Sequence, residues 1–257
     1  MKPRVDINCD LGESFGRFKI GHDDEIMPFI TSANIACGFH AGDPVVMAKT
    51  VRLAKENGVA VGAHPGFADL TGFGRRYMEL SKEEVVNIVL YQVGALEAFA
   101  RVAGVDLQHV KPHGALYNAA ARNEDYTKAI IEAVYALNPR LVIFALAGSR
   151  MARMAEEAGL RVAHEVFVDR AYSPDGSLIP RSVAGAVIED VSLAAKRAVR
   201  IVKEKKVAAV DGHDVEFGKV HTICVHGDTL NAVGLARALR EALLASRVEI
   251  VPVGTFV

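Results

Sequence analysis

The sequence has few cysteines, no excess of charge of either sign and no segment of low complexity. Its three cysteines, Cys9, Cys37 and Cys224, are odd in number and widely spaced, which argues against a disulfide framework and favours a reduced, cytoplasmic location. Thirty basic residues stand against 31 acidic ones, which gives a formal charge of −1. Because this charge balance does not indicate a basic surface, neither nucleic acid nor an anionic membrane is expected as a partner.

Two further absences bound the architecture. No apolar run reaches the length of a transmembrane helix, and Met1-Lys2-Pro3 leads directly into a predicted strand, so we expect neither a membrane span nor a signal sequence. No Pro/Ser-rich linker divides the 257 residues, and 51% of them are hydrophobic. We therefore predict a single domain over residues 1–257 with a substantial core.

Short buried runs alternate with helical patterns along the chain. The runs predict strands at residues 4–10, 33–37, 59–63, 107–111, 141–146, 161–167 and 221–225, a hairpin at 207–217 and a last short strand at 248–253. Helices between most of these strands imply parallel pairing with right-handed crossovers. Polar residues follow many different strands, and such ends converge on one face in a closed barrel but not in an open sheet. We predict an α/β fold with a seven-stranded barrel, with the last strand as an alternative closure of the ring.

Four histidines, His40, His64, His113 and His226, each follow a predicted strand within a few residues. Their equivalent placement predicts one shared polar site at the mouth of the barrel. The other five histidines lie in loops or within strands and receive no role: His22, His109, His164, His213 and His221.

Aspartates supply the candidates for a general acid or base. Asp43 and Asp228 are explained as helix N-caps. Asp10 and Asp169 have no such explanation and are the best candidates, followed by Asp6, which shares a strand face with Asp10.

Basic residues are expected near the same site, namely Arg75, Arg76, Lys111 and Arg170. They would neutralise the acids, or hold a carboxylate or phosphorylated group, for which the arginine fork is suited. No ATP-binding loop is apparent. In the nearest pattern, Gly212 to Lys219, the glycine spacing is one residue too long and Val220 replaces the required Ser/Thr.

A metal site is left open by the sequence. An aspartate with two histidines is a hydrolytic ligand set, and water bound to such a metal ionises near neutral pH. However, no His-x-x-His or Cys-x-x-Cys spacing is present, so the ligands would come from separate strands. If a divalent metal is bound, the expected ligands are Asp10, His40, His64 and His113.

These motifs closely resemble the LamB/YcsF family over nearly the whole chain. The shared segments are Asp6 to Glu13, Asn34 to Pro44, Gly62-Ala63-His64-Pro65, Gly72 to Arg76, Lys111 to Asn118, Asp169-Arg170 with Tyr172, and His226-Gly227-Asp228. The resemblance implies a seven-stranded (β/α) barrel of the polysaccharide-deacetylase type. It also implies opening of the 5-oxo-L-proline lactam to L-glutamate, driven by ATP, together with 5-oxoprolinase subunits B and C. One departure is Phe67-Ala68-Asp69, where the family often has a proline before the aspartate.

Our hypothesis is a pocket for 5-oxoproline or a phosphorylated form of it. Lys111 or Arg170 would hold the carboxylate, and Asp10, assisted by His40 or His113, would activate water. The full set of expected catalytic residues is Asp10, His40, His64, His113 and Asp169, and the expected substrate contacts are Asn8, Glu13, Asn34, Arg75, Lys111, Tyr117, Arg170 and His226. Two alternatives stay open: a stand-alone metal-dependent deacetylase or amidase acting on a small or carbohydrate substrate, and a non-catalytic substrate-binding subunit.

Overall fold

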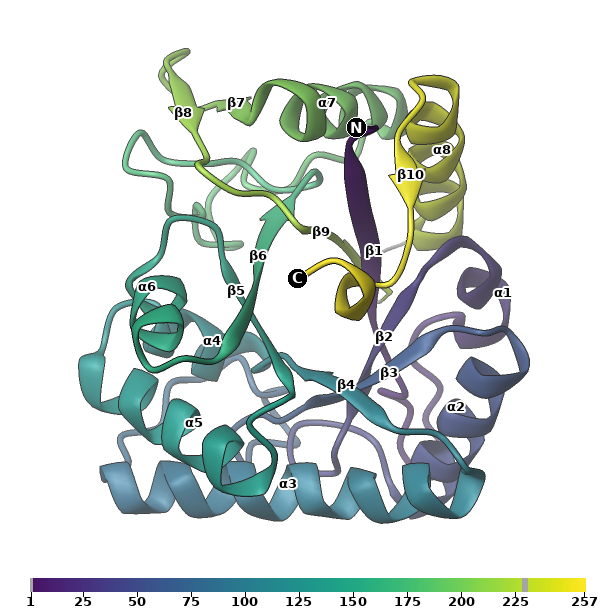
Figure 1. Ribbon diagram of the computed structural model, residues 1–257, viewed down its shortest axis with the longest axis vertical. Helices are drawn as coiled ribbons and strands as arrows, with labels where there is room; N and C mark the ends of the chain where they lie inside the picture. Colours follow the sequence, from purple (N-terminus) through teal and green to yellow (C-terminus); the bar gives the residue numbers. More distant parts are fainter. Residues whose placement is uncertain (1, 228–230) are drawn as a thin grey trace.

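Parallel strands close into a barrel in the computed structural model, which describes residues 2–227 and 231–257. Within these residues the barrel has seven strands, and β9 returns to pair with β1 (Figure 1). In order around the ring they are β1 (Arg4–Leu11), β2 (Ser32–Ala36), β3 (Ala60–His64), β4 (Leu107–Val110), β5 (Val142–Leu146), β6 (Arg161–Phe167) and β9 (Thr222–His226). The predicted seven-stranded (β/α) barrel is therefore confirmed.

Helices surround the strands (Figure 1). They are α1 (Asp23–Ile26), α2 (Pro44–Glu56), α3 (Lys82–Ala103), α4 (Gly114–Ala120), α5 (Glu124–Leu137), α6 (Arg150–Glu157), α7 (Val191–Glu204) and α8 (Ala232–Ala245), with 3-10 turns η1 (Met27–Phe29) and η2 (Val253–Thr255). Their starts follow the sequence signals. Asp43 accepts hydrogen bonds from the first turn of α2, and Ser81 and Glu84 form a capping box at α3. Asp228, expected to cap the last helix, lies outside the described residues.

The last strand, β10 (Glu249–Ile250), does not close the ring. It pairs with Arg4 and Val5 of β1, whereas β9 pairs with β1 from Asp6 to Asp10. The turn that follows places Val253 in a buried cluster with strands β5 and β6, and in Figure 1 the C-terminal turn lies over the centre of the ring. The predicted hairpin is present as β7 (Lys206–Ala208) and β8 (Asp214–Glu216).

Helix α3 corrects one expectation. By length and composition alone it is apolar enough to cross a membrane, although we expected no such segment, and core helices of water-soluble proteins pass the same test. In the fold it packs against α2 and α5, and it buries Val85, Val89, Val93 and Leu96. Its apolar face is thus accounted for by contacts within the chain.

The turn between β2 and α2 provides a stability test of the loop that carries His40. Gly42 has φ +78°, and an added Cβ would lie 2.9 Å from the Gly12 carbonyl oxygen. Gly58 has a similar φ of +65° but open space around it. We expect Gly42→Ala to lower the free energy of unfolding by about 2–4 kcal/mol, because strain and overlap add, and Gly58→Ala by only about 1–2 kcal/mol. Urea unfolding measures both, and equal losses would contradict the proposed close approach at Gly42.

Candidate active site

Polar side chains from several strands meet at the carboxyl end of the barrel, around a cavity of about 340 Å³. Asp10 follows from β1, His64 from β3, His226 from β9, and Lys111 and His113 from the segment after β4. The predicted substrate contacts Arg75, Tyr117 and Arg170 also line it. The long loop after β6 contributes Leu178, Ile179, Pro180 and Arg181. One mouth therefore gathers residues that are far apart in the sequence.

Asp10 lies at the floor of this cavity with a cation on one side. Its Oδ1 accepts hydrogen bonds from Lys111 Nζ at 2.9 Å and from Asn34 Nδ2 at 2.8 Å, and its Oδ2 lies 3.4 Å from His64 Nε2. Burial alone would raise the pKa of Asp10, but the neighbouring His64 and Lys111 outweigh it and hold that pKa well below its usual range. Asp10 is therefore ionised at neutral pH and able to accept a proton.

Lys111 is fully committed to protein partners. Besides Asp10, its Nζ lies 2.9 Å from Glu165 Oε1, 3.0 Å from Cys224 Sγ and 3.1 Å from Asn8 Oδ1. An ammonium has three hydrogens to donate, so none is left for a substrate carboxylate. These contacts keep Asp10 in place, and the expected contact of Lys111 with a substrate carboxylate stays a prediction.

His64 and His113 face one another through one ring nitrogen each. In the neutral rings, both of these nitrogens lack a proton. His64 Nδ1 lies 2.7 Å from the Lys111 carbonyl oxygen and His113 Nε2 lies 2.8 Å from that of Phe73, so these nitrogens carry the protons. The remaining two, His64 Nε2 and His113 Nδ1, are 2.9 Å apart. Two lone pairs at this distance repel each other unless a proton or a cation lies between them.

Glu13 and His40 complete a group of four metal-ligand types. Glu13 Oε1 lies 3.2 Å from His40 Nε2 and 3.6 Å from His113 Nδ1, and the rings of His40 and His113 stack at 3.7 Å. One donor atom each from Glu13, His40, His64 and His113 lies within 4.8 Å of the others. Burial, together with neighbouring histidines, lowers the pKa of His40 and His113 well below the usual range, so both rings are neutral. His40 Nδ1 is buried without a hydrogen-bond partner among the described residues.

This donor set fits a divalent metal, because transition metals bind neutral imidazole and carboxylate. The geometry changes the expected ligand set in one respect: Glu13, rather than Asp10, groups with the three histidines. Asp10 instead belongs to a second group with Cys224 and His226. His40 was expected to assist Asp10, and Glu13 was expected to contact substrate. Neither residue lines the cavity, and in this structure both contact other members of the Glu13–histidine group.

His226 and Asp169 form a dyad on the other side of the floor. Asp169 Oδ2 accepts a hydrogen bond from His226 Nδ1 at 2.7 Å, which fixes the proton on that nitrogen and directs Nε2 to other contacts. Burial would raise the pKa of Asp169, but His226 outweighs it and the pKa is lowered. His226 lines the cavity, whereas Asp169 does not line it and reaches it only through its contact with His226.

Arginines make up most of the charge on the cavity wall. Arg75 and Arg170 were expected there, and Arg122 and Arg181 add to them from loops without a recognisable motif. Burial and the nearby charge of Arg181 lower the pKa of Arg170, as expected for two guanidinium groups that face the same space. Arg76, in contrast, does not line the cavity and binds Asp69 through Nε at 2.9 Å.

Asn8 and Asn34 lie beneath the cavity rather than on its wall. Both are fully buried, and Asn34 Nδ2 donates to Asn8 Oδ1 at 2.7 Å. Asn34 donates to Asp10 and Asn8 accepts from Lys111, so in this structure they contact residues of the cavity rather than line it, and their role as substrate contacts stays a prediction. Asp6 lies deeper still, where it accepts hydrogen bonds from Thr31 and Ser32, and burial raises its pKa to about 6. It is too far down the barrel to serve as the base.

Sequence reasoning missed two buried residues beside this site. Glu165 of β6 contacts Lys111 and Asn8, and burial together with the charge of Glu165 raises the pKa of Tyr117. His109 of β4 contacts Asn34 at 2.7 Å. The available signal was a charged or polar residue in the middle of an otherwise apolar strand, which requires buried partners.

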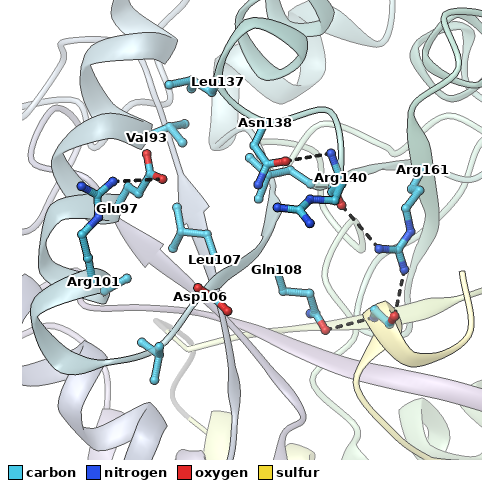
Figure 2. A pocket seen from close by; sticks show the side chains of 14 residues that line it. Val93, Glu97, Arg101, Asp106, Leu107, Gln108, Leu137, Asn138, Arg140 and Arg161 are labelled. Carbon is cyan, nitrogen blue, oxygen red and sulfur yellow. Dashed lines mark hydrogen bonds and ion pairs between the residues drawn. The ribbon is translucent and has the colours of Figure 1, made fainter.

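A second cavity, of about 450 Å³, lies at the opposite, amino end of the strands. Figure 2 shows Glu97 and Arg101 of α3 on one wall and Arg140 and Arg161 on the other, with Gln108 beside the C-terminal turn. None of the predicted site residues lines it. The chemistry predicted from the sequence therefore belongs to the carboxyl end alone.

The fold and the site together define a (β/α)-barrel enzyme with an acid–histidine pocket at the carboxyl ends of its strands. Residues 5–257 match the LamB/YcsF family, and the chain belongs to it. It is 58% identical over 254 residues, 99% of each chain, to a protein of Pyrococcus horikoshii that is named as the A subunit of 5-oxoprolinase.

Solved structures agree with this placement. The structure of a lactam utilization protein from Thermus thermophilus is 52% identical, with a TM-score of 0.92 over 96% of this chain and 99% of that one. A T48 deacetylase solved with substrate has a TM-score of 0.50 at 14% identity, over 98% of this chain and 89% of that one. The second likeness concerns the fold alone and confirms the polysaccharide-deacetylase-like barrel.

Proposed function

We propose that this chain is the hydrolytic A subunit of an ATP-dependent 5-oxoprolinase, which opens the lactam of 5-oxo-L-proline to L-glutamate. The observation that carries the proposal is the ionised Asp10 at the floor of a small cavity, flanked by His64 and by the His226–Asp169 dyad. Relatives at this level of identity that bear the name of the 5-oxoprolinase A subunit support it.

In this mechanism Asp10 removes a proton from water as the oxygen attacks the lactam carbonyl carbon. When the ring C–N bond breaks, protonated His226 gives its Nε2 proton to the departing nitrogen, which becomes the amino group of glutamate. Asp169 holds the His226 ring and stabilises its charge. Proton transfer is thus divided between a base and an acid that lie on different strands.

The arginines of the wall take the anionic part of the substrate. The charge of Arg181 lies close enough to lower the pKa of Arg170, and one carboxylate needs only one guanidinium fork. The surplus supports a phosphorylated form of 5-oxoproline, delivered by 5-oxoprolinase subunits B and C, which would use ATP outside this chain. With that form, ring opening by water leaves an acyl phosphate, and a second water then releases inorganic phosphate and glutamate. The free, buried cysteines support the cytoplasm as the location of this complex.

A divalent metal fits the group of Glu13, His40, His64 and His113. When bound, such an ion would polarise a carbonyl or lower the pKa of water nearby. We expect the chelator-treated chain to bind about one Zn²⁺ per molecule, and His113→Gln to weaken binding at least ~100-fold, because one of four ligands is lost. Isothermal titration calorimetry with elemental analysis measures this.

His213→Gln is the matched control, since His213 is exposed and pairs only with Asp211. If His113→Gln and the control bind Zn²⁺ equally, the metal assignment is wrong. Zn²⁺ binding should also weaken as the pH falls, because protons compete for the imidazole nitrogens.

The function is tested by reconstitution. ATP-dependent conversion of 5-oxoproline to glutamate is measured with purified subunits B and C, with and without this chain. We expect turnover only when all three are present. Turnover by B and C alone would remove the hydrolytic step from this chain.

The Glu13–histidine group also favours a second candidate, a stand-alone metal-dependent deacetylase or amidase. That function requires the metal-loaded chain to release acetate or ammonia from an amide without ATP or partners. The same preparation used in the reconstitution separates the two activities.

A further inference from the structure

Asn34 holds the base Asp10 from below, and the direction of its amide decides whether that contact is favourable. Its Nδ2 donates to Asp10 Oδ1 at 2.8 Å and to Asn8 Oδ1 at 2.7 Å. With the amide reversed, the carbonyl oxygen of Asn34 would face the carboxylate of Asp10. Two acceptors facing each other in a buried site are strongly unfavourable.

The other end of this amide rests on His109. His109 Nε2 lies 2.7 Å from Asn34 Oδ1, and Gln108 Nε2 lies 3.2 Å from His109 Nδ1. Because the Gln108 NH₂ group can only donate, His109 Nδ1 accepts and the ring proton is on Nε2. Burial lowers the pKa of His109 to about 3, so the ring stays neutral in this tautomer.

The register of the strands lets His109 of β4 reach Asn34 of β2 across β3, which lies between them. Asn34 of β2 and His109 of β4 are both in register with Gly62 of β3. A Cβ at Gly62 would overlap the His109 imidazole, so only glycine leaves room for the ring to reach Asn34. On its other side the His109 ring stacks on Phe144 at 4.1 Å.

We propose that His109, seated over Gly62, is a positioning residue that locks the Asn34 amide with its NH₂ group toward Asp10. In this way it fixes the position of the Asp10 carboxyl group without contacting the substrate. This role goes beyond the proposed hydrolysis and concerns the hydrogen-bond geometry beneath Asp10 in the chain itself.

The test is His109→Phe, which preserves the aromatic stack on Phe144 and removes the N–H donor. We expect the side-chain NH₂ signals of Asn34 in the ¹H–¹⁵N NMR spectrum of the isolated chain to shift and to double, because the amide is no longer held in one orientation. The Asn34 signals are assigned by their absence in Asn34→Ala. In the reconstituted complex kcat should fall about 10- to 100-fold, with KM little changed.

His164→Phe is the matched control, because His164 is also a buried strand histidine but pairs with Glu156 away from the cavity. It should leave the Asn34 NH₂ signals unchanged. Gly62→Ala should reproduce the change in the Asn34 signals seen in His109→Phe, since its Cβ displaces the ring.

A folded His109→Phe chain whose Asn34 NH₂ signals match those of the wild type would overturn the proposal. The kinetic measurement rests on the proposed function, whereas the NMR measurement does not. Changed Asn34 signals with no turnover by any preparation would therefore count against the proposed function and leave the role of His109 supported.

Discussion

Asp10→Asn should abolish glutamate formation by the reconstituted complex, with kcat reduced at least ~1,000-fold, because the amide cannot take a proton from water. The change is nearly isosteric, and the carbonyl of the new amide still accepts the hydrogen bond from Lys111. Since Lys111 also keeps Glu165, Cys224 and Asn8, no buried charge is left alone. We therefore expect normal folding and normal assembly with subunits B and C, measured by size-exclusion chromatography beside the glutamate assay.

Asp24→Asn is the control for this change. Asp24 is exposed and pairs with Lys49 at 3.2 Å, so its loss should leave kcat within about twofold of the wild type. Retained turnover in Asp10→Asn would remove Asp10 from the scheme and direct attention to His226 as the base.

His226→Gln should lower kcat about 100- to 10,000-fold, because the departing nitrogen then lacks its proton donor. Steady-state kinetics of glutamate release by the reconstituted complex measures this loss.

Asp169→Asn tests the dyad separately. An amide at position 169 can donate to His226 Nδ1 and so favours the wrong tautomer, which should cost nearly as much as losing the histidine. The double variant should then be no slower than His226→Gln alone, because the two residues act as a unit. Additive losses would show that Asp169 has a role of its own. His22→Gln, at an exposed histidine that pairs with Glu25, serves as the control.

The ring of strands and eight of the 18 residues that line the cavity could be predicted from the sequence, since each depends on local signals. Strand periodicity, glycine turns and caps such as Asp43 and Ser81 are recognised within a few residues. That His64 and Asp10 meet follows from the barrel topology alone, because parallel strands bring their carboxyl ends together.

What the sequence could not supply is the depth of each residue below the mouth. Asn8 and Asn34 face the same interior as Asp10, yet they lie beneath it and contact protein groups only. Lys111 was expected, as an alternative to Arg170, to bind the substrate carboxylate because it is one of four basic residues near the predicted pocket. Its four partners come from three other strands, and only the three-dimensional structure shows that they use up its hydrogens.

The gap that Gly62 leaves between Asn34 and His109 has a consequence for how the family can vary. Any side chain at position 62 would occupy the space of the imidazole, so the two positions are not independent under mutation. Across the family, a larger residue at 62 should therefore occur only together with a small one at 109. Members of the family with both replacements would have to hold the Asn34 amide, and with it the Asp10 carboxyl group, through other residues.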